Sequence, residues 1–403
     1  MKQLLHTPEG VRDIYNVEYA QKLSLQERLH HVLHSYGYQD IQTPTFEFFD
    51  VFSKEIGTIP SKELYKFFDK EGSTLVLRPD ITPSIARMAA TLFEDETLPL
   101  RLCYIENTFI NHSSYLGRLK ESTQLGAELI NDSSANADAE MLALVIDGLK
   151  HAGLKEFQLT VGHAGFFQNL MERSNMNEED EKKAREFIGN RNFFGLDELL
   201  DKINVEQEVK TTFAALPELI GGIEILEEAK KAAPDQKSLQ EILHLETIYD
   251  ILKSYGVEKY VTFDLSMSGT YGYYTGIVFR GYTYGTGDAV VKGGRYDRLI
   301  QKFGKDFPAI GFAVSVDELM NALKRQKISL PCGNKNMIVL YEEAEYQNAV
   351  RYTCELRKEN KNVILLQKDP ERSLEEYEEY GKKNMSYQIV FLQNDKEIKR
   401  IEL

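Results

Sequence analysis

The spacing of apolar residues predicts an α+β arrangement in the first part of the chain. Residues 16–36 have apolar positions at helical spacing and are followed by Gly37, a common helix stop. Four strand-like stretches and a second helix follow, at 38–49, 74–80, 101–110, 121–130 and 135–152. Strands in succession with helices between them are typical of a domain built on a mainly antiparallel sheet.

The pattern changes between 171 and 257, where the segments have helical periodicity and almost no strand signal. Strand patterns then resume, and the predicted order is strands at 259–268, 276–285 and 288–294, a helix at 294–304, a strand at 308–314 and a helix at 316–326. We therefore predict a core of residues 1–170 and 258–328, interrupted by a helical insertion at 171–257.

A third region follows a linker-like segment, SLPCGNKN. Three buried-type strands alternate there with two helical segments and precede a last short strand. This order predicts a small α/β domain at 335–403.

Composition narrows the class of protein. The chain has 403 residues and a formal net charge of −15, which lowers the expectation of a large nucleic acid as partner. Neither a signal peptide nor a membrane-spanning run is evident, so we expect a cytoplasmic protein. Three widely spaced cysteines, Cys103, Cys332 and Cys354, fit reduced structural thiols.

Three histidines, His30, His31 and His34, lie on the first predicted helix. A metal site needs further ligands, commonly acidic or cysteine side chains, and the neighbouring sequence does not indicate them. We therefore expect ordinary surface histidines, no metal site and no cofactor.

Five stretches carry a resemblance to a known family. They are TPEGVRD, LRPDITPSIAR, the hairpin at 104–130, YYTGIVFRGY and the stretch from KGGRYDRL to SVDEL. In this order and spacing they resemble the histidyl-tRNA synthetase family over roughly residues 5–325. The resemblance implies a class II aminoacyl-tRNA synthetase-like antiparallel sheet with helices, which dimerises through its first long helix and neighbouring strands. The C-terminal region resembles a shortened anticodon-binding domain.

Three positions depart from that family. Where its members hold ATP with arginines, this chain has Ile110, Gly269 and Glu318. Removing a single preorganised donor from such a site lowers the rate by about 10² to 10³. The resemblance therefore implies a dismantled adenylation site. Arg118, in the hairpin loop, fits either a retained phosphate contact or a solvated loop residue.

The amino-acid pocket of the family is kept. The resemblance places Asp80 and Thr82 at the α-amino group, with Gln124 alongside, and Glu128 and Tyr274 at the imidazole. Tyr273 and Tyr296 would line the site. Neighbours in a strand face opposite ways, which favours Tyr274 over Tyr273 as the direct contact. Because Gly269 has no side chain, the partner of the ligand carboxylate is left open.

A kept histidine pocket without the ATP arginines, together with LRPD, resembles the regulatory subunits of ATP phosphoribosyltransferase. These are synthetase paralogues that join a short-form catalytic subunit in the first step of histidine biosynthesis. The resemblance implies a non-catalytic homodimer within a hetero-octamer, with L-histidine as feedback ligand and no tRNA. Two alternatives stay open: an active histidyl-tRNA synthetase, and a free-standing histidine sensor without a transferase partner.

Overall fold

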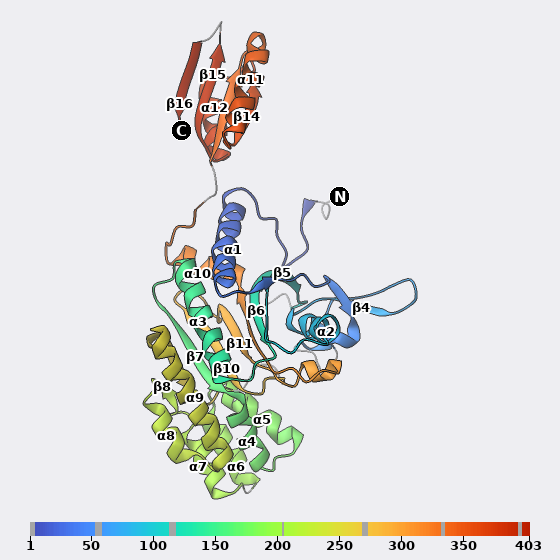
Figure 1. Ribbon diagram of the computed structural model, residues 1–403, viewed down its shortest axis with the longest axis vertical. Helices are drawn as coiled ribbons and strands as arrows, with labels where there is room; N and C mark the ends of the chain where they lie inside the picture. The colour runs from blue at the N-terminus through green and yellow to red at the C-terminus, as the bar shows by residue number, and fades with distance from the viewer. Residues whose placement is uncertain are drawn as a thin grey trace. The chain divides into compact units, whose positions relative to one another are not determined.

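The computed structural model describes residues 5–52, 59–112, 118–203, 205–267, 273–331, 335–393 and 397–403. The chain divides into two compact units, shown in Figure 1. The larger unit comprises Met1–Arg12 and Gln26–Ser329, and the smaller comprises Asp13–Leu25 and Leu330–Leu403.

A nine-stranded sheet forms the centre of the larger unit, in the order β1-β5-β6-β12-β11-β10-β7-β9-β8. Its strands are β1 (Gln39–Asp40), β5 (Leu100–Phe109), β6 (Glu121–Ile130), β7 (Phe157–His163), β8 (Ile220–Gly221), β9 (Val261–Asp264), β10 (Ile277–Thr283), β11 (Val291–Arg295) and β12 (Ala309–Ser315). Only the β1–β5 and β7–β9 pairs among these strands are parallel. The predicted mainly antiparallel sheet is confirmed.

Four helices and a second small sheet accompany this sheet. The helices are α1 (Val17–Ser35), of which residues 26–35 belong to the larger unit, α2 (Thr82–Leu92), α3 (Ala135–Ala152) and α10 (Val316–Arg325). The small sheet has the order β2 (Phe46–Phe48), β4 (Thr74–Leu77), β3 (Lys66–Phe68). Helix α3 begins where the Ser134 side chain accepts from the Ala137 N–H and ends at Gly153, with φ +106°. Its apolar face packs on β7 and β12.

A group of helices lies between β7 and β9 in the chain and gathers beside the large sheet (Figure 1). It comprises α4 (Ala164–Arg173), α5 (Glu178–Gly189), α6 (Phe193–Lys202), α7 (Gln207–Ala215), α8 (Ile225–Ala232) and α9 (Gln236–Tyr255). Helix α9 packs against α3 and α4. The first helix of this group, α4, starts at residue 164, seven residues before the predicted start of the insertion. The limits 171–257 for the helical insertion stay a prediction.

Two side-chain contacts hold α9, one to the end of β7 and one to α3. His163 Nε2 lies 3.1 Å from Glu241 Oε2, and His244 Nε2 lies 2.7 Å from Asp138 Oδ2. Asp138 Oδ1 also accepts from Arg295 Nε at 2.8 Å. Burial lowers the pKa of His163 to about 3, so this ring is neutral.

Two details of the predicted elements were wrong. The helix predicted at 294–304 is the end of β11 followed by a 3₁₀ turn at Ile300–Phe303, because Gly294 and Arg295 pair with β12. The apolar residues have helical spacing over a single turn only, and this turn ends at Gly304 with φ +92°. Strand β7, in the middle of the sheet, was not predicted.

The smaller unit contains the four-stranded sheet β14-β13-β15-β16. Its elements are β13 (Asn336–Tyr341), α11 (Tyr346–Lys358), β14 (Val363–Gln367), α12 (Leu374–Lys383), β15 (Ser386–Gln393) and β16 (Glu397–Glu402). The first three strands of the sheet are parallel and β16 is antiparallel, so the predicted small α/β domain is confirmed. Across both units, none of the described helices has the length and apolar character needed to cross a membrane.

Candidate functional site

A cavity of about 1080 Å³ lies in the larger unit, over the hairpin of β5 and β6 and the adjoining strands β11 and β12. Six of the seven residues predicted to bind an amino acid line it: Asp80, Thr82, Gln124, Tyr273, Tyr274 and Tyr296. The seventh, Glu128, is bonded to two of them. The structure therefore brings all seven residues together, from four separate stretches of the chain.

Glu128 is the centre of a buried hydrogen-bond network. Its Oε1 accepts from Thr82 Oγ1 at 2.9 Å and its Oε2 accepts from the Tyr296 hydroxyl at 2.5 Å. Burial raises the pKa of Glu128 to about 8. The hydrogen bonds from Tyr296 and Thr82 lower the pKa, and the charge of Asp80 raises it further. The carboxyl group is thus mostly neutral at pH 7 in the ligand-free protein.

Glycines make room for these side chains. Glu128 lies opposite Gly311 in the β6–β12 pair, and a Cβ at Gly311 would fall 1.5 Å from Glu128 Oε2. Gly294 pairs with Gly311 across β11 and β12, and a Cβ there would fall 2.8 Å from the Tyr274 ring. Two paired glycines thus form a floor on which Glu128 and Tyr274 rest.

Two residues near Glu128 carry groups suited to an ammonium ion. Asp80 lies just before α2, is 9% exposed, and its Oδ1 accepts from the Ile81 N–H at 2.8 Å. Gln124 Oε1 is buried and has no hydrogen-bond partner among the described residues. An unpaired buried acceptor costs about 1 to 3 kcal/mol, so a donor on a ligand would stabilise this arrangement.

Strand alternation, which favoured Tyr274 over Tyr273 as the direct contact, does not apply to these two neighbouring residues. Both precede β10, which begins at Ile277, so strand alternation does not apply and both line the cavity. The Tyr273 ring centroid lies 4.9 Å from that of Tyr274 and 5.9 Å from that of Tyr296. The phenol seen bonded to Glu128 is that of Tyr296.

Two residues that support the site, Tyr104 and Arg78, were not predicted from the sequence. Tyr104 is fully buried opposite Gly126, on the same face of the hairpin as Gln124 and Glu128, and burial raises its pKa. The antiparallel register of the two strands could have identified it. Arg78, in the LRPD motif, pairs with Glu106 at 2.9 Å.

Arg78 also donates to the carbonyl oxygens of Thr43 and Asn107, each at 2.8 Å. Glu106 in turn accepts from the Thr43 N–H and hydroxyl. This buried ion pair, with its further hydrogen bonds to the backbone, fixes the turn that carries Asp80.

The other end of the cavity contains the substituted ATP positions. Ile110 continues the hairpin past β5, with its N–H donating to the Lys120 carbonyl at 2.9 Å, and lines the cavity. Glu318 also lines it, at the start of α10, where Ser315 provides the cap. Gly269 lies outside the described residues.

Charges of both signs surround that end. His112, Arg118 and Lys292 line it beside Glu63 and Asp288. Lys292 pairs with Asp288 at 2.9 Å, and the pKa of His112 is lowered by burial and then by Arg118. Arg118 is exposed and lines the cavity, so both interpretations of this residue stay open.

The sheet, the hairpin and the cavity over it define a class II synthetase-like protein of the histidyl-tRNA synthetase type. Residues 10–319 match the family described as histidyl-tRNA synthetase. The histidyl-tRNA synthetase of Nostoc sp. PCC 7120 shares the fold, with a TM-score of 0.80 at 20% identity over 98% of this chain and 96% of that chain.

More similar relatives identify the particular family. Proteins named ATP phosphoribosyltransferase regulatory subunit are 40% identical in Acetivibrio thermocellus, over 88% of this chain and 85% of the relative, and 38% identical in Ruminiclostridium cellulolyticum, over 89% and 86%. A crystal structure from Bacillus halodurans, described as an ATP phosphoribosyltransferase regulatory subunit/histidyl-tRNA synthetase, has a TM-score of 0.87 at 31% identity, over 98% of this chain and 99% of that chain. The chain belongs to the ATP phosphoribosyltransferase regulatory subunit family. The predicted regulatory, non-catalytic role is confirmed.

Proposed function

We propose that this chain binds L-histidine in the cavity and makes a short-form ATP phosphoribosyltransferase sensitive to it. The observation that carries the proposal is the buried network around Glu128, next to an unpaired Gln124 oxygen. Polar groups buried in this way are costly unless a ligand or a partner completes them.

Histidine matches the donors and acceptors of this end of the cavity. Its ammonium group has three N–H donors for Asp80, Thr82 and Gln124. Its imidazole can exchange hydrogen bonds with the carboxyl of Glu128, with Tyr273, Tyr274 and Tyr296 around the ring. A site built on such bonds rejects an apolar side chain of similar size, because the buried polar groups would then be left unpaired.

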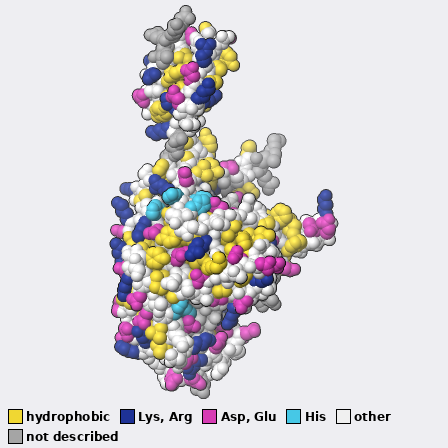
Figure 2. All heavy atoms as spheres, in the orientation of Figure 1, with side chains coloured by type: hydrophobic (Ala, Val, Ile, Leu, Met, Phe, Trp, Pro, Cys, Tyr) yellow, Lys and Arg dark blue, Asp and Glu magenta, His cyan; other side chains and the backbone are white. Residues whose placement is uncertain are grey.

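Assembly is a further part of the proposal. The chain would form a homodimer within a cytoplasmic hetero-octamer with the catalytic subunit. The absence of tRNA binding is supported by the net charge of −15 and by the mixture of acidic and basic side chains on the face seen in Figure 2.

Calorimetric titration with L-histidine tests the pocket. Truncating a buried charged or hydrogen-bonded partner costs about 2 to 5 kcal/mol, so Glu128→Ala should weaken binding tenfold or more. Glu121→Ala is the matched control, because Glu121 lies on the same strand and is exposed. Thermal unfolding of each variant is measured first, and an unchanged affinity in folded Glu128→Ala would remove this residue from the site.

Regulation is tested by adding the chain to a short-form catalytic subunit and titrating histidine in the transferase assay. The wild-type chain should co-elute with that subunit, raise its activity and make it histidine-sensitive, with a coupling of about 1 to 3 kcal/mol. The complex with Glu128→Ala should need more histidine for the same inhibition. Failure to co-elute would favour the free-standing sensor, and equal inhibition of both complexes would place the regulatory pocket elsewhere.

A further inference from the structure

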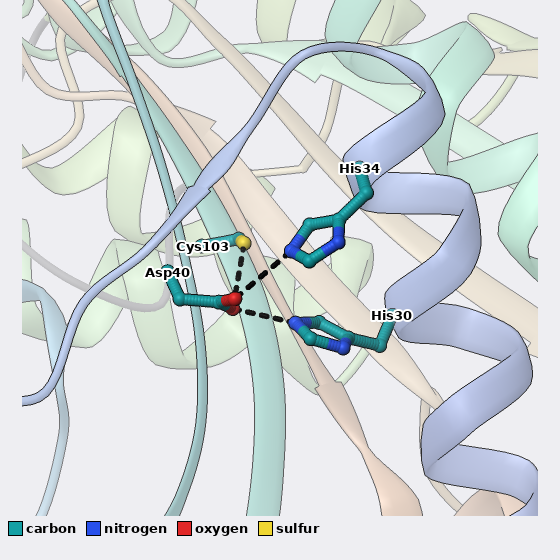
Figure 3. A group of neighbouring side chains, drawn as sticks. All are labelled: His30, His34, Asp40 and Cys103. Atoms are coloured by element: carbon teal, nitrogen blue, oxygen red, sulfur yellow. Dashed lines mark hydrogen bonds and ion pairs between the residues drawn. The ribbon is translucent and has the colours of Figure 1, made fainter.

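Four side chains with metal-binding atoms converge on the far side of the hairpin strand β5. Figure 3 shows His30 and His34 of α1, Asp40 of β1 and Cys103 of β5 around one point. One ligand atom from each lies within 4.8 Å of all the others. His30 Nε2 is 2.5 Å from Asp40 Oδ1, His34 Nε2 is 2.9 Å from Oδ2, and Cys103 Sγ is 3.5 Å from Oδ1.

The fold explains this convergence. His30 and His34 are four residues apart on α1 and therefore share a face of the helix. The chain turns at Gly37, with φ +82°, and β1 then pairs in parallel with β5, so that Asp40 lies directly beside Cys103. The sequence around the histidines did not indicate an acidic or a cysteine partner. Asp40 comes from β1, just after the turn at Gly37, and Cys103 comes from β5, 63 positions further along the chain.

We propose that His30, His34, Asp40 and Cys103 bind a divalent transition-metal ion, with Zn²⁺ the best match to the donors. One thiolate, two imidazoles and a carboxylate are the ligand types of tetrahedral zinc. Zinc bonds of about 2.0 to 2.3 Å place the ligand atoms about 3.3 to 3.8 Å apart. The observed separations bracket this range, so side-chain adjustments of about 1 Å complete the tetrahedron.

Hydrogen bonds to Asp40 can hold both imidazoles and the thiol in place without an ion, so the kinds of donor atom decide between the two arrangements. An aspartate can accept from two histidines at a surface without any ion. Cys103, however, is a buried side chain aimed at the same carboxylate, and soft sulfur is the donor that favours zinc over magnesium or calcium. The Asp40 side chain is 55% exposed, which leaves the ion a way in from solvent.

The ion would act on structure rather than on chemistry, since four protein ligands close its coordination. It would tie the end of α1 and strand β1 to β5. Cys103 precedes Tyr104, which lies on the cavity side of the same strand. The metal site is therefore separate from the histidine pocket, and its test does not depend on the proposed function.

Cobalt substitution tests the proposal. The full chain is reduced, freed of metal with a chelator and titrated with Co²⁺, whose thiolate complexes give a near-ultraviolet charge-transfer band and whose tetrahedral complexes absorb strongly in the visible region. One equivalent should produce both signals, and Zn²⁺ should remove them. Cys103→Ser should abolish the charge-transfer band, and His34→Gln and Asp40→Asn should each weaken binding tenfold or more.

Matched controls use groups of the same kind outside the cluster. His31→Gln changes an exposed histidine on the same helix. The double variant Cys332→Ser/Cys354→Ser removes the other two thiols, of which Cys354 is exposed and Cys332 lies outside the described residues. Both controls should retain the spectrum. The proposal is overturned if wild type gives no thiolate band, if the double variant loses it, or if folded Cys103→Ser or His34→Gln binds cobalt like wild type.

Discussion

The two ends of the cavity differ in how their polar groups are held. At the amino-acid end, Glu128 is 1% exposed and Tyr296 is 2% exposed, and each has a defined partner. At the other end, which the resemblance assigns to a lost nucleotide site, Ile110 and Glu318 line the cavity and Arg118 is exposed. At the first end, hydrogen bonds hold the buried side chains in fixed positions. The second end is a partly open surface with charges of both signs.

This difference bears on the cost of substitutions at the two ends. Exposed charges contribute little to stability, so replacing them leaves the fold intact. The buried network is different, because removing one member leaves the others unpaired. Substitutions at the partly open end should therefore disturb the fold less than substitutions in the network around Glu128.

The largest effect on histidine binding and on stability is expected from Gly311→Ala, which adds a methyl group beneath Glu128. The new Cβ would lie 1.5 Å from Glu128 Oε2 and 2.8 Å from the Ala127 carbonyl oxygen. Overpacking of this kind costs about 1 to 3 kcal/mol in stability, and displacement of Glu128 should reduce histidine affinity at least a hundredfold. Calorimetry and thermal unfolding measure the two effects.

Gly287→Ala is the control for that experiment. Gly287 lines the other end of the cavity, and a Cβ there meets no described heavy atom within 4 Å. It should bind histidine like wild type. Equal losses in the two variants would show that the two ends do not differ in packing.

A second effect is expected in the pH dependence of stability. The pKa of Glu128 is raised to about 8 in the folded protein, so folding takes up a proton between its ordinary value of 4.5 and about 8. The contribution of Glu128 is fully present below pH 4.5, is lost as the pH rises to about 8, and changes no further above that. Denaturant unfolding should show this loss in wild type and a smaller one in Glu128→Gln. Parallel curves for the two proteins would mean that Glu128 is ionised in the fold.

A smaller effect on histidine affinity should distinguish the roles of Tyr296 and Tyr274. Tyr296→Phe removes the donor to Glu128 Oε2 and should weaken histidine binding about tenfold, since leaving a buried acceptor unpaired costs about 1 to 3 kcal/mol. Tyr274→Phe leaves the Tyr296–Glu128 hydrogen bond in place and should therefore cost less. Tyr284→Phe, at a side chain that is 77% exposed, is the control. The reverse order of the first two variants in calorimetry would restore Tyr274 as the main contact.

The smallest effect is expected at the nucleotide end. Ile110→Arg should leave histidine-dependent ATP–pyrophosphate exchange undetectable, because Glu318 and Gly269 still replace the other two arginines. Binding of histidine should stay within about twofold of wild type. Exchange at about 1 s⁻¹ or more in this variant would be typical of an enzyme and would show that the adenylation site is intact apart from one residue.

Local patterns predicted most of the fold, because the signals for α1, α3, the β5–β6 hairpin and the C-terminal strands lie within short segments. The 3₁₀ turn at Ile300–Phe303 was missed, since Leu299, Ile300 and Phe303 have helical spacing that lasts a single turn. Strand β7 was passed over, although its residues Leu159 and Val161 alternate as a buried strand does.

The pocket residues were placed by resemblance, and the structure adds the contacts that decide their roles. No local pattern could show that Tyr296 donates to Glu128, since 168 positions separate them. The metal-type cluster was missed for the same reason, because Asp40 and Cys103 meet only through the pairing of β1 with β5. Chemistry that depends on the register of distant strands is not visible in a single sequence.

Arg295 and Tyr296 are consecutive residues with different anchors. Tyr296 is bonded to Glu128 in the cavity, while Arg295 is held 2.7 Å from Asp138, which is also bonded to His244 of α9. Consecutive Cα atoms are a fixed distance of about 3.8 Å apart, so a displacement of one anchor is felt by the other. A ligand that displaced Tyr296 would therefore also displace Arg295, and with it the contact between Asp138 and His244 that holds α9.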